Sequence, residues 1–383
     1  MIYFDHAATS FPKPPEVVEA ARRFLESGGA SPGRGSYPGA IDSGMLLCEI
    51  RERLAARFGL RDPMRVIFGL NATDALNLAI AGTLDPGDHA ITTALEHNSV
   101  IRPLKELERR RGVSVTVLPV RPGEALDPAD VAAAIAPRTR ALVVNHGSNS
   151  FGTVLPLREL GALCRARGLT FIVDAAQTAG VVPVSIDEDG VDLLAFSGHK
   201  ALMGPMGTGA LLLADSFDSA RLQPLRVGGT GSQSERLLAP DFLPDRFECG
   251  TPNMPGLAGL HAALGLDTSG LADHKRRLVR RFMDRALASV PGIAFYVPSD
   301  RLQTGAVSFN LAGRTPSAVA RALSERADIA CRPGLQCSPL SHRSAGTFPQ
   351  GTVRFSFGWR NTDAEIETAV AALAEVARGG PTP

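Results

Sequence analysis

The sequence predicts an α/β protein in which a large domain, built on a mostly parallel β-sheet, is joined to a smaller α+β domain. Three observations support this prediction. Seven short apolar runs follow one another through the first two thirds of the chain, amphipathic segments separate them, and the pattern changes after about residue 260. The length of 383 residues suits one large and one smaller domain.

The expected strands of the large domain are short, apolar and regularly spaced. Continuous apolar runs of this kind are typical of strands buried on both faces, as in a parallel sheet. Segments 98–112 and 157–168 have the pattern of helices between strands, and Gly168 is a helix stop. This alternation predicts helices on both faces of an open sheet, with ligand-binding residues at the carboxyl ends of its strands. The seven runs are 65–70, 89–95, 113–120, 141–146, 170–176, 192–198 and 209–214.

The smaller domain is expected from the change in pattern beyond residue 260. We assign residues 15–260 to the large domain and residues 1–14 plus 261–383 to the small one. Its expected helices and strands are 256–266, 273–289, 305–311, 315–326, 352–357 and 362–377.

The composition excludes several classes of function. Hydrophobic residues make up 44% and charged residues 21%, as in ordinary soluble proteins. The net charge of +1 gives no electrostatic reason to expect a nucleic-acid or anionic-membrane partner. No apolar run approaches the roughly 20 residues that span a bilayer, and the N-terminus lacks the pattern of a signal peptide. We therefore expect a cytoplasmic protein, whose five cysteines are free thiols.

The lysines are few enough to be considered one by one. Lys13, Lys105 and Lys275 lie in proline-rich or charged segments and are expected on the solvated surface. Lys200 instead follows the buried run 192–198 and precedes a glycine-rich stretch. Its surroundings lack the GK[ST] order of a phosphate-binding loop, and no GxGxxG opens a helix after the first strands. We expect Lys200 to carry a carbonyl cofactor as a Schiff base.

Two further segments can be matched to such a cofactor. Asp174 ends another apolar run, and a carboxylate there can pair with a protonated pyridine nitrogen. Gln177 lies three residues on and can reach a ring hydroxyl. In the segment NATDALN, Ala72 and Thr73 open a helix whose N–H groups can bind a phosphate. Taken alone, Asp174 is as well explained as an ordinary strand-end aspartate, and a plain helix cap is the alternative explanation for the NATDALN segment.

Together these motifs resemble the NifS-like cysteine desulfurases, which belong to aminotransferase class V among the fold-type I enzymes that use pyridoxal 5′-phosphate (PLP). The matching segments are spread over nearly the whole chain in the family's order. They are YFDHAATS (3–10), NATDALN (71–77), EHNS (96–99), SNSFGTVLP (148–156), VDAAQ (173–177), FSGHK (196–200), GTPN (250–253), RPGLQC (332–337) and GTVRFSFG (351–358).

The resemblance implies how the cofactor is held. Lys200 would carry PLP, Asp174 would bind its pyridine nitrogen, Gln177 its ring oxygen, and His97 would stack on the ring. Thr251 would reach the phosphate of the partner subunit, so a homodimer is implied. The phosphate contacts within the chain would come from Ala72, Thr73, Ser197 and His199.

The resemblance also implies a substrate site and a nucleophile. Asn149 and Arg354 would hold the substrate carboxylate, to which the planar guanidinium is matched. Cys337 lies in a segment rich in Gly, Pro and Ser, which predicts a mobile loop. Its composition alone leaves a reactive thiol and a small buried residue equally open; the RxGxxC match favours the nucleophile. His342, Arg332 and Arg343 are the cations expected to favour its thiolate.

Two features near Cys337 are interpreted differently. Cys331 precedes the motif and is expected to be a packing residue. The spacing of Cys331, Cys337 and His342 is irregular and has no evident fourth ligand, so we expect no metal site.

The function implied by the resemblance is that of a PLP-dependent cysteine desulfurase. It would convert L-cysteine to L-alanine, leave a persulfide on Cys337, and pass the sulfur to a protein acceptor. A selenocysteine lyase, or a class V aminotransferase, epimerase or C–S lyase, would share the fold without needing the persulfide. A catalytically silent scaffold is the alternative from another class, and it would lack the Schiff base on Lys200.

Overall fold

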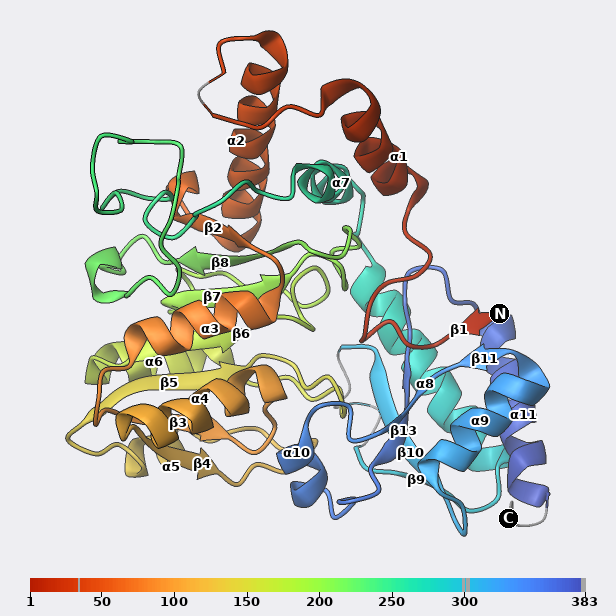
Figure 1. Ribbon diagram of the computed structural model, residues 1–383. Coiled ribbons are helices and arrows are strands. Elements are labelled where there is room, and N and C mark those ends of the chain that lie inside the picture. The colour runs from red at the N-terminus through yellow and green to blue at the C-terminus, as the bar shows by residue number, and fades with distance from the viewer. Residues whose placement is uncertain (34, 298–299, 301–303, 380–383) are drawn as a thin grey trace.

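The computed structural model describes residues 1–33, 35–297, 300 and 304–379. Its largest sheet has seven strands in the order β2-β8-β7-β6-β5-β3-β4 (Figure 1). Each expected strand of the large domain is present in this sheet. The strands are β2 (Val66–Gly69), β3 (His89–Thr93), β4 (Ser114–Leu118), β5 (Thr139–Asn145), β6 (Thr170–Asp174), β7 (Leu193–Ser197) and β8 (Gly209–Leu213).

The predicted parallel pairing is confirmed for the middle of this sheet. Strands β4, β3, β5, β6 and β7 pair in parallel, whereas β8 is antiparallel to both of its neighbours, β7 and β2. Parallel strands have their carboxyl ends at one edge. Asn145, Asp174 and Ser197, the last residues of β5, β6 and β7, are therefore neighbours at that edge.

Helices cover both faces of the sheet, as predicted. In Figure 1, α3 and α4 lie in front of the strands and α6 lies behind them. Helix α7 packs against α1 and α2 beyond the β2 edge. The helices are α1 (Pro15–Arg23), α2 (Pro38–Phe58), α3 (Ala72–Thr83), α4 (Asn98–Arg111), α5 (Pro128–Ala133), α6 (Leu157–Arg167) and α7 (Met254–Leu264).

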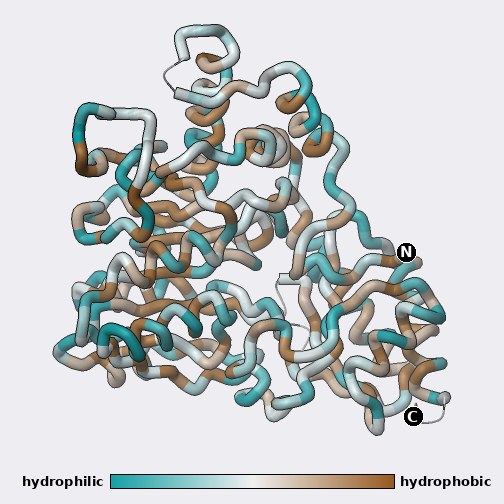
Figure 2. Tube along the Cα trace, viewed as in Figure 1, coloured by the Kyte–Doolittle hydropathy of each residue, from teal (hydrophilic) through white to brown (hydrophobic). Residues whose placement is uncertain are grey.

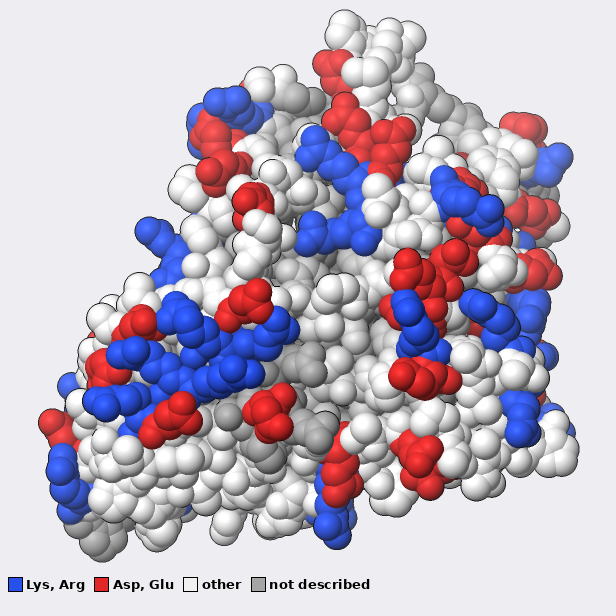
Figure 3. Space-filling view, turned by 180° about the vertical axis from the view of Figure 1, so that it is seen from behind, with Lys and Arg blue, Asp and Glu red and all other residues white. Residues whose placement is uncertain are grey.

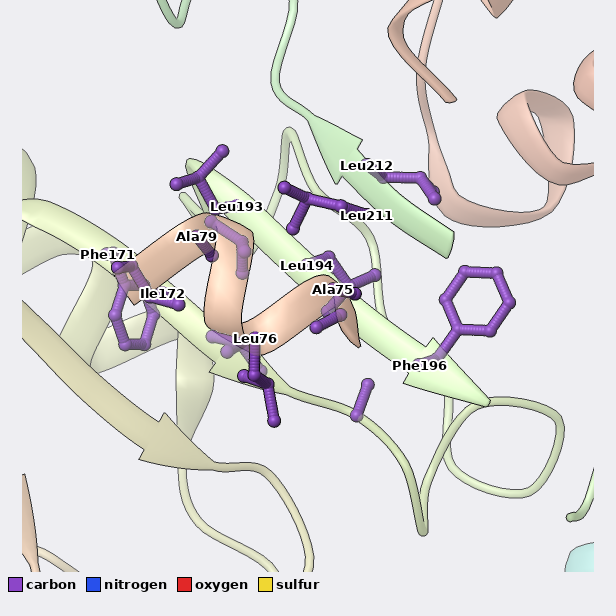
Figure 4. Close-up of a cluster of buried hydrophobic side chains, with 14 of the residues drawn as sticks. Ala75, Leu76, Ala79, Phe171, Ile172, Leu193, Leu194, Phe196, Leu211 and Leu212 are labelled. Carbon is purple, nitrogen blue, oxygen red and sulfur yellow. The ribbon is translucent and has the colours of Figure 1, made fainter. Parts of the chain in front are cut away.

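The main hydrophobic core lies between the sheet and its helices. Leu76 of α3 packs among Ile172 of β6 and Leu194 of β7, all fully buried (Figure 4). Apolar residues run through the strands, whereas the outer loops mix hydrophilic, intermediate and apolar residues (Figure 2). Because the strands are buried on both faces, they read as apolar runs without alternation.

A second unit carries the C-terminal residues. Its antiparallel sheet has the order β12-β13-β10-β9, and a separate parallel pair joins β1 to β11. Phe4, Phe282, Phe309, Phe355 and Phe357 are fully buried in its own core. The elements are β1 (Ile2–Tyr3), α8 (Leu271–Ser289), β9 (Ile293–Phe295), β10 (Ala306–Leu311), α9 (Pro316–Ala327), β11 (Ile329–Ala330), β12 (Arg332–Gly334), α10 (Pro339–Ser344), β13 (Thr352–Ser356) and α11 (Asp363–Arg378).

The two hydrophobic cores support the domain division that we propose from the sequence. Leu260 of α7 belongs to the core of the large sheet, and the second core takes up the chain again at Leu278 of α8. Phe4 joins the second core although it comes from the N-terminus. The boundaries 15–260 and 1–14 plus 261–383 remain our proposal.

A basic stripe runs along α8 on the back of the molecule (Figure 3). Arg281 and Arg285 pair with Glu367 of α11, and Arg277 pairs with Asp363 of the same helix. The positive charge of the stripe is thus largely compensated by carboxylates, and these ion pairs connect α8 to α11. No helix among the described residues is long and apolar enough to cross a bilayer.

Leu194 tests the main core. Leu194→Ala should lower the free energy of unfolding by about 2–5 kcal/mol, because it leaves a cavity between α3 and the sheet. Leu287→Ala, on the exposed face of α8, should change it by less than about 0.5 kcal/mol. Urea unfolding of both variants provides the measurement, and equal losses would contradict the assignment of this core.

Candidate active site

A cavity of about 240 Å³ opens at the carboxyl edge of the large sheet. It collects most of the residues that the sequence indicated, although they are far apart in the chain. Its walls are formed by Asn71, Ala72, Thr73, His97, Ser99, Asn145, Gly147, Asn149, Asp174, Ala176, Gln177, Ser197, His199 and Lys200.

The N-terminus of α3 forms one end of the cavity. The Asn71 side chain caps the helix by accepting the N–H of Asp74 at 3.0 Å. The N–H of Ala72 donates to the Ser197 hydroxyl at 2.9 Å, and the Thr73 hydroxyl lies 2.7 Å from that of Ser99. The hydroxyls of Thr73 and Ser197 at this positively polarised helix N-terminus make a suitable phosphate site.

His97 lies on the cavity wall as the N-cap of α4. Its Nδ1 accepts the N–H of Ser99 at 3.1 Å, so the ring proton belongs on Nε2. Burial, followed by the charges of Lys200 and Arg354, lowers the pKa of His97 to about 4. The imidazole is therefore neutral at physiological pH, which suits stacking on an aromatic ring.

Lys200 and Asp174 provide the titrating pair of the cavity. Burial lowers the pKa of Lys200, and Asp174 partly opposes this shift. Burial raises the pKa of Asp174, which accepts the N–H of Ala176 at 2.8 Å. No ion pair to Asp174 is found within the ranges that the structure describes. Its carboxylate is consequently available to a cationic group in the cavity.

The N-terminal segment packs beside the cavity and corrects one prediction. Lys13 was expected on the surface, but its Nζ donates to the backbone oxygen of His199 at 2.8 Å. The Ser10 hydroxyl donates to the same oxygen at 3.1 Å, and His199 Nδ1 lies 3.0 Å from the Thr9 hydroxyl. Burial lowers the pKa of Lys13 to about 8. Sequence composition alone did not reveal this fold-back of the N-terminus.

Arg354 lies on β13, next to the cavity residue Asn149, with 2% of its surface exposed. Its Nη2 donates to Asp5 Oδ1 at 2.6 Å, and its Nη1 donates to the backbone oxygen of Asn149 at 3.0 Å. Its Nε is buried and has no partner among the described residues. Arg332 binds the other oxygen of Asp5 at 2.7 Å. The buried, unpaired Nε–H is a free donor for a carboxylate.

The predicted mobile loop around Cys337 is instead a strand, a turn and a helix. Arg332–Gly334 pairs with β13, and Pro339–Ser344 forms α10. The turn between them contains Gln336 and Cys337, both with left-handed backbone, at φ +43° and +60°. The Cys337 thiol is exposed, and its backbone oxygen accepts the N–H of Asn98, next to His97, at 2.7 Å. Long-range hydrogen bonds order this turn despite its Gly- and Pro-rich composition.

The three cations expected near Cys337 have different surroundings. Arg332 interacts with it electrostatically. His342 is fully buried between Gln336 and Thr347, at 2.9 and 2.7 Å, and burial lowers its pKa to about 4. Arg343 stacks over Phe348. The prediction is therefore wrong for His342 as a cation, because its ring is desolvated and neutral.

The second cysteine of the motif region behaves as expected. Cys331 packs against the second hydrophobic core, and burial raises its pKa to about 12. A thiol of this kind stays protonated at neutral pH and is inert.

Lys275 was also expected on the surface, and this is wrong. It is 7% exposed, and no hydrogen bond or ion pair of its amine is found within the described ranges. Burial lowers its pKa to about 8. With His6, Gln177 and Lys200 it lines a water-sized cavity behind the main one. The many charged residues of α8 suggested that Lys275 was exposed, but one face of this helix packs inward and buries the lysine.

The structure separates one predicted site residue from the rest. Thr251 is exposed in the turn before α7 and lines a different pocket, together with Cys48 and Cys249. Within one chain it does not reach the cavity, so its expected contact with a partner subunit stays a prediction.

Two residues of the site were missed. Asp5 holds both Arg354 and Arg332, and Ser99 links His97 to Thr73. Both lie in segments that matched the family, YFDHAATS and EHNS, so the matching segments were the available signal.

The residues of the cavity fit PLP. The α3 N-terminus with its hydroxyls suits a phosphate, and the unpaired Asp174 carboxylate suits a protonated pyridine nitrogen. The neutral ring of His97 suits stacking, while the depressed pKa of Lys200 suits an amine that must react as the free base.

The architecture is that of the fold-type I α/β enzymes, and the comparisons identify the family. Residues 2–368 match the family described as Aminotransferase class-V. The chain belongs to this family. It is 32% identical to a probable cysteine desulfurase of Methanothermobacter thermautotrophicus, over 99% of this chain and 95% of that protein. It is 33% identical to a probable cysteine desulfurase of Pyrococcus abyssi, over 99% of this chain and 94% of that protein.

Solved structures agree with this similarity. A cysteine desulfurase from Thermococcus onnurineus superimposes with a TM-score of 0.89 at 30% identity, covering 98% of this chain and 94% of that one. The Escherichia coli cysteine desulfurase CsdA gives a TM-score of 0.84 at 27% identity, covering 97% and 94%. The resemblance inferred from the motifs, and the predicted fold class, are confirmed.

Lys275 generates a prediction with a defined pH dependence. Below pH 8 its amine is charged in both the folded and unfolded states, and the folded protein bears the cost of burying that charge. Between pH 8 and 10.5 only the unfolded chain keeps the proton, so the cost disappears as pH rises. Lys275→Met should therefore stabilise the protein by about 1–3 kcal/mol at neutral pH, with a smaller gain towards pH 10.

Chemical denaturation of both proteins from pH 6 to pH 10 provides the measurement. The exposed Lys105→Met serves as the control and should leave the free energy of unfolding within about 0.5 kcal/mol at every pH. A gain for Lys275→Met that grows with pH would contradict the assignment of a buried, unpaired amine.

Proposed function

We propose that this protein is a PLP-dependent cysteine desulfurase, which converts L-cysteine to L-alanine and leaves a persulfide on Cys337. One observation carries the proposal: the Lys200 amine and the Asp174 carboxylate line one cavity, and the Arg354 guanidinium binds the wall residue Asn149. The exposed Cys337 thiol lies on a turn whose backbone oxygen accepts the N–H of Asn98, next to His97. The names of the similar proteins support the same activity.

The residues proposed to hold PLP are those that line the cavity. Asp174 would face the pyridine nitrogen, Gln177 the ring oxygen and His97 the ring face, while Lys200 would bind covalently. When bound, PLP withdraws electrons from the α-carbon of an amino acid. Thr251 of a second subunit would complete the phosphate site, so we propose a homodimer. The phosphate ligands within the chain would be Ala72, Thr73, Ser197 and His199.

The substrate would be oriented through its carboxylate. The buried Nε–H of Arg354 is unpaired, and the adjacent amide of Asn149 lies on the cavity wall. A charge-assisted hydrogen bond at a desolvated site is stronger than a neutral one. Arg354 and Asn149 would thus fix the α-carbon of L-cysteine near Lys200.

Lys200 and Cys337 would divide the chemistry between them. Burial of the Lys200 amine favours its neutral form, which can take the α-proton as a general base. The Cys337 thiolate would attack the substrate sulfur, so that an S–S bond forms while the bond between that sulfur and Cβ breaks. Lys200 would return a proton to Cα and Cβ would take up a second proton, which completes L-alanine, and the persulfide stays on Cys337.

The persulfide would then pass to an acceptor protein in the cytoplasm, the compartment that we propose for the enzyme. The exposure of Cys337 is compatible with such a transfer, because an acceptor thiol must reach the outer sulfur.

Cys337→Ala separates the steps that need the cofactor alone from the transfer of sulfur to the thiol. The variant should still bind PLP and respond spectroscopically to L-cysteine, because these steps need Lys200 and Asp174 but no thiol. Alanine and persulfide formation should fall by about three orders of magnitude or more, since the nucleophile is gone. Combined assays of alanine and sulfide measure this. Near-full activity would instead assign the protein to the lyases or aminotransferases, and Cys331→Ala is the control.

Lys200→Ala tests the cofactor. Wild-type protein should bind PLP covalently, and borohydride should fix the label on Lys200. Lys200→Ala should lose this label, whereas Lys275→Met should keep it, because its amine lies in the smaller cavity. Peptide mass spectrometry identifies the labelled residue. A label on Lys275 or Lys105 of the wild-type protein would refute the assignment.

A further inference from the structure

The side-chain amide of Asn149 binds the residues on both sides of Cys337. Its Nδ2 donates to the backbone oxygen of Gln336 at 2.7 Å. Its Oδ1 accepts the Ser338 hydroxyl, also at 2.7 Å. Asn149 and Ser338 are buried, whereas Cys337 between the two contacts is exposed. One side-chain amide therefore binds both sequence neighbours of the proposed nucleophile.

The backbone conformation of Gln336 and Cys337 is unfavourable by itself. Gln336 and Cys337 have φ values of +43° and +60°, a left-handed conformation that residues with a Cβ rarely adopt in succession. Surrounding contacts must maintain it. The Gln336 side chain donates to the Thr352 backbone oxygen at 2.9 Å, and its Oε1 lies 2.9 Å from His342 Nε2. The turn is thus held in one defined geometry.

The hydroxyl of Ser338 bonds to a residue of the cavity and not to its own helix. Ser338 occupies the N-cap position of α10, where a serine normally accepts a backbone N–H of its own helix. Here it makes no such capping bond. Its hydroxyl donates to Asn149 instead. A serine at a capping position therefore connects the Cys337 turn to the cavity residue Asn149.

The other end of Asn149 reaches the proposed substrate site. Its backbone oxygen accepts Arg354 Nη1 at 3.0 Å. The amide nitrogen carries two hydrogens, and Gln336 takes one of them. The second remains for a carboxylate bound at Arg354. Asn149 therefore lies between the group that would hold the substrate and the two neighbours of the thiol.

We propose that Asn149 is a positioning residue, which transmits binding of the substrate carboxylate at Arg354 to the Cys337 turn through its contacts with Gln336 and Ser338. The inference rests on the proposed function, because it assigns a carboxylate substrate to Arg354. A carboxylate that draws on the Asn149 amide alters the bonds that hold the turn. The thiol is thereby set for attack when a substrate is present.

Ser338→Ala removes one of the two hydrogen bonds between the Asn149 side chain and the turn, and it leaves the side chains of Asn149, Arg354 and the cofactor residues in place. Because Ser338 does not cap α10, the substitution costs no capping bond. Ser341→Ala is a matched control: it is equally buried in α10 and loses one hydroxyl bond, to the Ala94 backbone oxygen at 3.1 Å. In the PLP-loaded enzyme, Ser338→Ala should lower the rate of alanine formation about tenfold, with KM for L-cysteine changed by less than about twofold. Ser341→Ala should stay within about twofold of wild type.

A second measurement does not depend on turnover. L-alanine, the proposed product, has the carboxylate but no sulfur, and iodoacetamide reports on the Cys337 thiol by mass spectrometry. Saturating L-alanine should change the alkylation rate of Cys337 severalfold in wild-type enzyme and in Ser341→Ala, and should have little effect in Ser338→Ala. Simple blocking of access by L-alanine would persist in Ser338→Ala, so an equal effect in all three proteins overturns the proposal.

Two further sets of results would contradict either the proposal or the function on which it rests. If L-alanine leaves the alkylation rate of wild-type enzyme unchanged, or if both serine variants lose activity equally, Asn149 only folds the turn and the proposal is wrong. If wild-type enzyme forms neither alanine nor persulfide from L-cysteine, the proposed function fails. The alkylation experiment then still decides whether a carboxylate at the cavity acts on the Cys337 turn.

Discussion

The site depends on the carboxylate of Asp5, which two guanidinium groups share. Arg354 binds one oxygen and Arg332 the other. Arg354 is buried, and removing the partner of a buried charge typically costs about 3–5 kcal/mol. Asp5 comes from the N-terminal segment, Arg332 from β12 and Arg354 from β13. This ion pair therefore joins the first residues of the chain to the two strands that carry the proposed nucleophile turn and the proposed substrate ligand.

The N-terminal segment makes a second connection, to the large sheet. Beyond Asp5, the Thr9 and Ser10 hydroxyls and the Lys13 amine all bind the backbone oxygen of His199, one residue before Lys200. A segment of about a dozen residues thus spans both hydrophobic units and contacts both halves of the site. Any rotation of one unit against the other would have to break these bonds, so the segment helps to hold the amine and the guanidinium in register.

Burial gives the cavity its chemical character. His97, His199 and His342 are neutral because desolvation lowers their pKa values to about 4, and the amines of Lys200, Lys13 and Lys275 are shifted in the same direction. Asp5 and Asp174 oppose this excess of basic groups within the site. A phosphate and a substrate carboxylate would supply the missing negative charge, which agrees with the proposed cofactor and substrate.

Local patterns in the sequence were enough to predict the seven strands of the large sheet, the lysine and aspartate at its carboxyl edge, and the family. Apolar runs and strand-end residues are local signals, and the matching segments preserve the order of the family. Three features became visible only in the folded chain: Lys13 and Lys275 are buried, Asp5 pairs with two arginines, and the Cys337 segment is an ordered turn. These features depend on hydrogen bonds and desolvation between residues up to 349 positions apart, which neither composition nor periodicity records.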